Sequence, residues 1–145
     1  MTSSSSEQEY SKLAQEDISF PGTVKVRVED DRTGMSEETL KRAIADSLYY
    51  VQGKGECFAT VHDYYMAVAH SVRDRILQRR IKTAQTHTDN RVKTVYYLSA
   101  EFLMGRYTGN SLINLGLYEK IRNVLKESGL ELDDLLEKEH EPGLG

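Results

Sequence analysis

Cysteine and long apolar runs are both scarce in this chain of 145 residues. Its one cysteine, Cys57, cannot form an internal disulfide, and a lone thiol fits a reducing compartment. No apolar run approaches the ~20 residues that a membrane-spanning helix needs. The stretch from Thr2 to Gln8 is polar and lacks the hydrophobic core of a signal peptide. We therefore expect a cytoplasmic protein that makes no membrane contact.

The chain also lacks an excess of positive charge. It has 19 basic and 23 acidic residues, a net charge of −4, which leaves no electrostatic footprint for nucleic acid. Several arginines, among them Arg73 and Arg75, gather in the second half of a predicted helix. Asp74 interrupts them and no aromatic platform accompanies them. A solvated or subunit-facing helix surface is the preferred interpretation.

Metal ligands are not evident either. The four histidines are not spaced with Cys57 in a zinc-binding pattern, so we interpret them as structural and expect no metal site. They are His62, His70, His87 and His140.

The length suits one domain with an N-terminal extension. Residues 1–35 are predicted to be a mobile tail that contains a short strand, where Val24, Val26 and Val28 alternate with charged residues. Residues 36–145 are predicted to form the first part of a larger domain.

Helices dominate the predicted domain. Ser36 can cap a helix that buries Leu40, Ile44, Ser47, Leu48 and Val51. A longer helix starts at Thr60, which has capping-box spacing to Asp63, and runs to about Lys82 with an apolar stripe that includes Val68 and Val72. Three short helices follow. They run from Asn110 to Leu117, from Tyr118 to Ser128, and around Leu132, Leu135 and Leu136.

One strand, from Val92 to Leu98, is predicted at the centre of the fold because it is rich in β-branched and aromatic residues. Glu101 follows its carboxyl end, where ligand-facing loops gather in α/β folds. Gly105 and Arg106 add a permissive backbone position and a guanidinium suited to carboxylate or phosphate. These residues form a candidate site. A purely structural ion pair between Glu101 and Arg106 is the alternative interpretation.

Several long motifs resemble the N-terminal part of the α-1,4-glucan (glycogen or starch) phosphorylases. The stretch from Val95 to Arg106 resembles the family signature YYLSxEFxMGR, and the stretch from Asp63 to Asp74 resembles its DYY…AHxVRD run. The stretch from Gly129 to Leu135 is similar to GLDxEEL, and Gly143 to Gly145 is similar to the start of a long glycine-rich motif. The resemblance covers the chain from about Ser36 onward.

The resemblance implies an α/β fold of the doubly wound type, in which the helix-rich residues 36–145 are an incomplete N-terminal part. It implies a glycosyltransferase of glycogen metabolism that releases glucose 1-phosphate from α-1,4-glucan, using inorganic phosphate and pyridoxal phosphate. The homodimer of the family is also expected. The resemblance does not separate glycogen, starch and maltodextrin as substrate.

No catalytic residue is expected within this chain, because the family's cofactor lysine and glucosyl-binding residues lie far downstream. The chain alone is expected to bind no cofactor and to be inactive. By resemblance, the residues expected to line the active site are Glu101, Leu103, Gly105, Arg106, Gly143 and Gly145. Leu103 falls where some members have a tyrosine near the cofactor ring, and Gly143 and Gly145 begin the turn whose later N–H groups face the phosphates.

Regulation by AMP is a weaker expectation. Gln85 matches one glutamine of the nucleotide site in vertebrate members, whereas Thr88 replaces the tyrosine that stacks on the base. A second class of function also remains open. The chain could be a truncated, non-catalytic module that binds a partner subunit or glucan.

Overall fold

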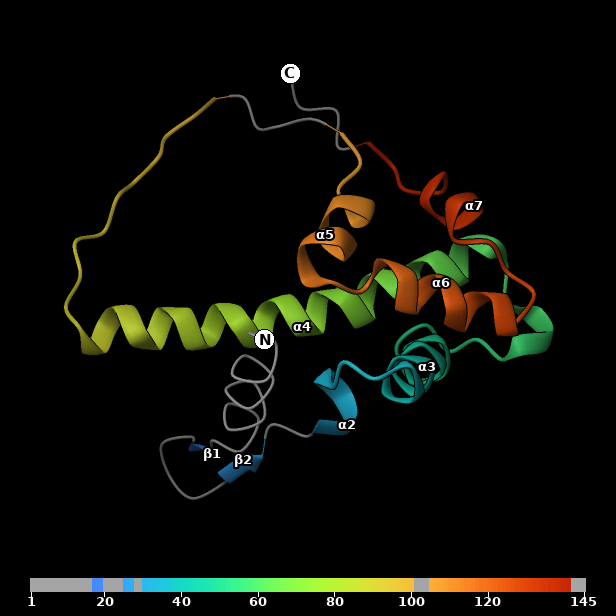
Figure 1. Ribbon diagram of the computed structural model, residues 1–145, viewed down its shortest axis with the longest axis horizontal. Helices are drawn as coiled ribbons and strands as arrows, with labels where there is room; N and C mark the ends of the chain where they lie inside the picture. The colour runs from blue at the N-terminus through green and yellow to red at the C-terminus, as the bar shows by residue number, and fades with distance from the viewer. Residues whose placement is uncertain (1–16, 20–24, 28–29, 101–104, 142–145) are drawn as a thin grey trace, which may run out of the picture.

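The structure is a computed structural model that describes residues 17–19, 25–27, 30–100 and 105–141. Within these ranges the chain is rich in helix, and Figure 1 shows most helices gathered around one half of a single long helix. In chain order the elements are β1 (Asp17–Ser19), β2 (Lys25–Arg27), α2 (Asp30–Thr33), α3 (Glu37–Asp46), a π-helical turn (Ser47–Val51), a 3-10 turn (Glu56–Phe58), α4 (Val61–Asp89), α5 (Thr108–Leu115), α6 (Tyr118–Glu127) and α7 (Leu132–Leu136).

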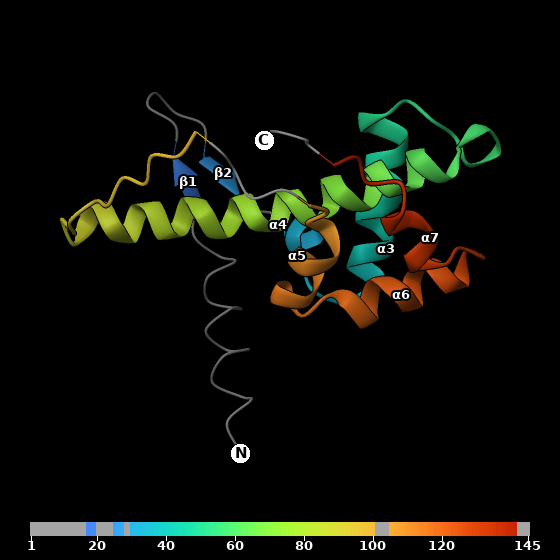
Figure 2. The same cartoon turned by 90° about the horizontal axis from the view of Figure 1, so that it is seen from above.

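The long helix α4 organises the described residues. Its start is fixed by the predicted capping box: Asp63 N donates to Thr60 Oγ1, and Thr60 N donates to Asp63 Oδ2 at 2.8 Å. The helix runs to Asp89, beyond the predicted end near Lys82. Its buried residues are Tyr65, Ala67, Val68, Ser71, Val72 and Arg75, so burial stops about halfway along it. The second half extends past the other helices (Figures 1 and 2).

The apolar stripe predicted for α4 is correct in its middle and wrong at several positions on either side. Val68 and Val72 are 1% and 4% exposed, as predicted. Val61, Ile76 and Ile81 keep helical spacing but are exposed. Spacing selects one face of a helix, but it does not say how far along that face another element packs.

Helix α3 crosses α4 and supplies the next part of the core. Ser36 caps it, accepting from Thr39 N at 3.2 Å, and Leu40, Ile44, Ser47 and Leu48 are buried as predicted. Val51, predicted to be buried with them, is 53% exposed. The π-helical turn explains the difference, because its wider i→i+5 winding rotates the last residues away from the face that α3 buries.

The three short helices, α5, α6 and α7, complete the core around the first half of α4, away from its end at Asp89. Leu112, Leu117, Ile121 and Leu135 are all at most 1% exposed and pack in one cluster with Val68. The helices occur where they are predicted, although α5 starts two residues earlier and α7 ends at Leu136. Gly116 and Gly129 follow α5 and α6 with φ of 69° and 72°, left-handed conformations that favour glycine.

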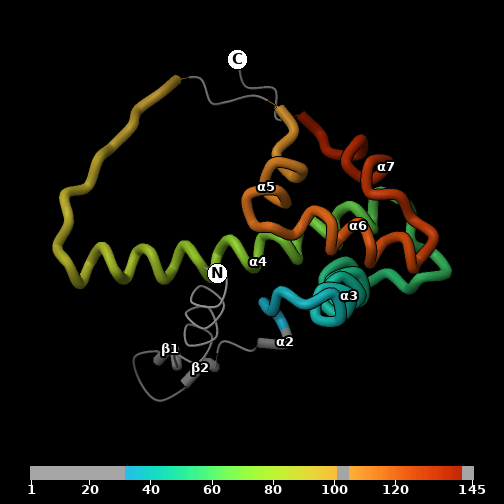
Figure 3. Tube along the Cα trace, viewed as in Figure 1, coloured from blue at the N-terminus to red at the C-terminus, as the bar shows by residue number. Residues whose placement is uncertain are grey.

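The predicted central strand from Val92 to Leu98 is not present in the described residues. This segment has no regular secondary structure, and Val95 and Leu98 are 90% and 92% exposed. Figure 3 shows it running clear of the helices after α4 ends. A strand requires a hydrogen-bonded neighbour, and no described segment lies beside this one. The described pairing is instead between β1 and β2, antiparallel with Ile18 opposite Val26. Strand β2 lies within the predicted N-terminal strand, whereas β1 was not predicted.

Truncating the buried valines of α4 should destabilise the chain. Val68→Ala and Val72→Ala should each lower the free energy of unfolding by about 1–3 kcal/mol, through lost burial and the cavity left behind. Val61→Ala is the matched control on the exposed side and should change it by less than about 0.5 kcal/mol. Urea unfolding followed by circular dichroism measures all three, and equal losses at the three positions would contradict the observed burial.

The exposed segment 92–98 should make the chain self-associate. Sedimentation velocity should detect oligomers, and a hydrophobic dye should bind the chain. Unpaired backbone groups and exposed apolar side chains both promote association. The double variant Val95→Lys with Leu98→Lys should restore a dye-silent monomer. Ile113→Lys, at another exposed apolar position, should leave association unchanged. A wild-type chain that sediments as a compact monomer and binds no dye would refute this prediction.

Candidate functional site

The predicted site residues fall into two groups. Glu101, Leu103, Gly143 and Gly145 lie outside the described residues, so their predicted roles stay predictions. Gly105 and Arg106 are described and lead directly into α5. The ion-pair partner of Arg106 comes from the stretch 137–141 after α7, which Figure 1 shows beside the start of α5.

Arg106 is held by an exposed ion pair. Its Nη1 lies 2.6 Å from Glu137 Oε2, and the two side chains are 46% and 71% exposed. The hydrogen bond and the charge of Glu137 raise the pKa of Arg106 above its ordinary value. Gly105, just before it, has φ of 129°, which L side chains rarely adopt, so its conformation requires glycine. The described acidic partner of Arg106 is therefore Glu137.

The start of α5 is capped by a distant carboxylate. Glu139 Oε1 accepts from Tyr107 N at 2.8 Å, and Glu139 Oε2 accepts from Thr108 N at 3.0 Å. Tyr107, at the N-cap position, makes no capping bond with its own side chain. An anion at this end of a helix satisfies free amide groups and complements the helix dipole. Glu139, 31 residues along the chain from Thr108, therefore caps α5 in place of a local N-cap side chain.

Behind this contact lies a buried polar pair. Tyr65 Oη and Thr108 Oγ1 are 3.4 Å apart, and both residues are 9% exposed. Burial raises the pKa of Tyr65, the hydrogen bond with Thr108 opposes this, and the Glu139 carboxylate adds to it. The rings of His62 and His140 lie 5.8 Å apart at the edge of the same cluster. Helix α4, the start of α5 and the stretch 137–141 therefore meet at one place.

Glu137 and Glu139 are residues that the sequence analysis missed. The sequence predicts a helix around Leu132, Leu135 and Leu136, and α7 ends at Leu136, which leaves both carboxylates outside it. No local pattern identifies their partners, because those lie about thirty residues earlier in the chain.

The interpretation of Arg75 as part of a solvated or subunit-facing helix surface is wrong. Arg75 is 1% exposed. Its Nε and Nη2 donate to Gly34 O at 3.1 and 2.6 Å, and its Nη1 donates to Ser71 O at 2.8 Å. Burial lowers its pKa to about 10, an effect that the charge of Asp74 partly offsets, so the guanidinium stays charged at neutral pH. The residue pins the loop before α3 to α4.

Gln85, the residue predicted to contact a nucleotide, is exposed near the end of α4. The 24 residues from Val61 to Gln85 correspond to about 36 Å of helix. The role of Gln85 stays a prediction.

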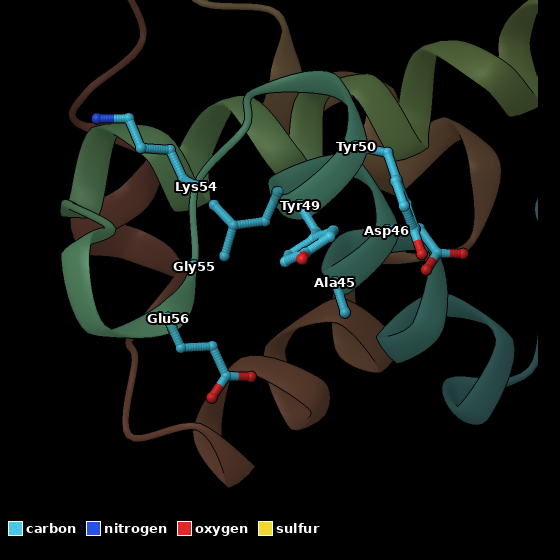
Figure 4. A pocket seen from close by; sticks show the side chains of 8 residues that line it. Ala45, Asp46, Tyr49, Tyr50, Lys54, Gly55 and Glu56 are labelled. Atoms are coloured by element: carbon cyan, nitrogen blue, oxygen red, sulfur yellow. The ribbon is translucent and has the colours of Figure 1, made fainter.

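A cavity of about 340 Å³ lies apart from the candidate site, at the end of α3. Tyr49 and Tyr50 line it and pack edge to face, with ring centroids 5.0 Å apart. Figure 4 shows the charged ends of Lys54 and Glu56 pointing in different directions, so they do not converge on one ligand position. None of the residues predicted for the active site lines this cavity.

In the described part of the chain, no group of three or more histidine, cysteine, aspartate or glutamate side chains is placed to hold a metal ion. Among the described helices, none is both long enough and apolar enough to cross a membrane.

Comparison with known proteins supports the resemblance seen in the motifs. No protein-family model matches the chain. Curated sequences do match, and they are phosphorylases, a class of glycosyltransferase. The chain is homologous to the glycogen phosphorylases, which confirms the resemblance.

Three relatives illustrate the match. Glycogen phosphorylase of Synechocystis sp. is 58% identical over 122 residues, which make up 83% of this chain and 14% of the relative. The liver form from Homo sapiens is 42% identical over 106 residues, 73% of this chain and 12% of the relative. The enzyme of Chlamydia trachomatis is 38% identical over 115 residues, 79% of this chain and 14% of the relative. The chain thus spans about one seventh of the length of these relatives.

Replacing the buried arginine should reveal how far the loop before α3 depends on it. Arg75→Lys loses the planar fork that reaches two carbonyl groups and should lower the free energy of unfolding by about 1–3 kcal/mol. Arg73→Lys, two residues earlier and exposed, should stay within about 0.5 kcal/mol of wild type. Thermal unfolding compares the two variants, and equal melting temperatures would show that the carbonyl contacts of Arg75 do not stabilise the fold.

Proposed function

We propose that this sequence is part of a glycogen phosphorylase that uses inorganic phosphate to release glucose 1-phosphate from the ends of α-1,4-glucan. The observation that carries the proposal is the 58% identity over 122 residues to a glycogen phosphorylase. The chain supplies walls of the active site, through Glu101, Leu103, Gly105, Arg106, Gly143 and Gly145, and contacts between subunits. It contains no catalytic residue of its own.

Pyridoxal phosphate is proposed as the cofactor of the whole enzyme, and its phosphate group would move protons beside the substrate phosphate. No lysine of this chain lies in a motif that resembles the family's cofactor site, so the cofactor lysine is proposed to lie in another part of the enzyme.

The segment 92–98 is proposed to become a central strand of a doubly wound α/β domain in the whole enzyme. Its apolar, β-branched and aromatic side chains are typical of an interior parallel strand. Their exposure in the described residues means that they have no cover here. Burying Val95, Tyr96 and Leu98 between neighbouring strands would remove this exposed surface and stabilise the fold.

A homodimer and a cytoplasmic location complete the proposal. The free half of α4 carries exposed Ile76 and Ile81, which a second subunit could cover. The single cysteine, Cys57, is free and exposed, as a reducing compartment allows.

The reaction is tested on the complete enzyme that carries this sequence. With glycogen, phosphate and cofactor, it should form glucose 1-phosphate, and omitting phosphate should abolish the product. Parallel assays with starch and maltodextrin would identify the preferred glucan. Formation of free glucose without phosphate would indicate a hydrolase and would refute the proposal.

Glu101 should be needed for turnover. Glu101→Ala should lower kcat by about tenfold or more, because it leaves a basic partner in the site without its carboxylate. Glu131→Gln removes an exposed carboxylate whose side chain makes no capping bond and should keep wild-type turnover. Wild-type kcat in a folded Glu101→Ala enzyme would favour the structural interpretation of this residue.

A further inference from the structure

We infer that Glu139 is a positioning residue for Arg106, holding its backbone in place while leaving its guanidinium free to exchange partners. The inference rests on the proposed function, in which Arg106 lines the active site of a phosphorylase. Its ligand there would be an anionic oxygen group, and inorganic phosphate is the one that the proposed reaction supplies.

The first step is the geometry of the backbone. The two amide groups that follow Arg106, those of Tyr107 and Thr108, both donate to the Glu139 carboxylate, at 2.8 and 3.0 Å. One carboxylate that accepts from two successive amides fixes the orientation of the peptide units on either side of Tyr107. The peptide bond between Arg106 and Tyr107 is one of these, so the contact determines where the side chain of Arg106 begins.

The second step is the support behind that contact. Thr108 is buried and its hydroxyl lies 3.4 Å from Tyr65 Oη on α4. Glu139 is itself half-buried. Water is therefore partly excluded from the amides that Glu139 satisfies, and a charge-assisted hydrogen bond is stronger under those conditions. The backbone of residues 106–108 is thereby tied to the long helix that anchors the core.

The third step is the contrast with the side chain of Arg106. The side chain of its partner Glu137 is 71% exposed, and the side chain of Arg106 is 46% exposed. An exposed ion pair of this kind is weak and exchanges readily with solvent or another anion. Arg106 thus combines a fixed backbone with a loosely held charge, which suits an arginine that must release one carboxylate to bind a ligand.

The test uses the complete enzyme, four variants at the site and one control variant. Glu139→Ala removes the contact, and Glu139→Gln keeps a carbonyl oxygen that can still accept from an amide. Arg106→Lys changes the group that Glu139 is inferred to position, and the double variant combines Arg106→Lys with Glu139→Ala. Glu131→Gln is the control at an exposed carboxylate.

Glu139→Ala should raise KM for phosphate about tenfold, the size expected for losing one hydrogen bond to a charged group, and leave KM for glucan unchanged. Glu139→Gln should recover most of that loss. The double variant should have the same KM for phosphate as Arg106→Lys alone, because both changes act on the contact between Arg106 and phosphate. A purely structural role would lower kcat through loss of folded enzyme and would not move KM for one substrate.

Hydrogen exchange provides a readout that does not depend on activity. The amides of Tyr107 and Thr108 should exchange faster in Glu139→Ala than in wild type, and the control variant should match wild type. An unchanged KM for phosphate in Glu139→Ala, or an additive double variant, would overturn the inference even if wild-type enzyme is active. If wild-type enzyme forms no glucose 1-phosphate, the proposed function fails and the assignment of Arg106 to phosphate fails with it. If the amides of Tyr107 and Thr108 also exchange at the same rate in Glu139→Ala and in wild type, the inferred backbone contact of Glu139 is refuted as well.

Discussion

The described structure depends on the burial of one half of α4. Between Tyr65 and Arg75 this helix buries six residues. Helices α3, α5 and α7 pack against α4, and α6 packs against those three helices. Each of the other helices is at most ten residues long. Helices of that length are marginal in water by themselves, so they acquire their stability by packing. The shared surface on α4 is what makes them one core.

Polar contacts then determine how the loops sit on this core. Arg75 fixes the loop before α3 through the carbonyl of Gly34, and Lys120 donates to the neighbouring carbonyl of Met35 at 2.8 Å. Glu139 fixes the start of α5 through two amides. In each case a charged side chain satisfies backbone groups that no helix or sheet supplies with a partner, which is a general requirement for backbone away from water.

Local sequence patterns predict the helices and their caps well. Ser36 and Thr60 act as caps because their side chains contact amides only three residues ahead, so the signal lies within a few positions. Apolar spacing likewise identifies Leu40, Val68 and Val72 as core residues. The burial of Val51 is predicted wrongly because a single π-helical turn alters the helical period. No residue in that turn is a sequence signal for it.

The contacts of the candidate site could not be predicted in the same way. Arg106 and Glu137 are 31 positions apart, and the chain offers many carboxylates of equal chemistry. The burial of Arg75 is equally hidden, since exposed and buried arginines have the same sequence signal. For segment 92–98 the sequence signal is present but the structure does not follow it. Its composition predicts a strand, but a strand also needs a hydrogen-bonded neighbour, and composition does not show whether one is there.

The unburied half of α4 has a mechanical consequence. From Arg75 to Asp89 the helix projects by 14 residues, a rigid arm of about 21 Å. A tilt of about 10° at the buried end displaces the tip of such an arm by almost 4 Å, about the length of one residue in the chain. Segment 92–98 begins just beyond that tip. The register in which it meets any neighbouring strand is therefore sensitive to small changes in packing at the opposite end of the helix, and a core of interlocking side chains resists those changes.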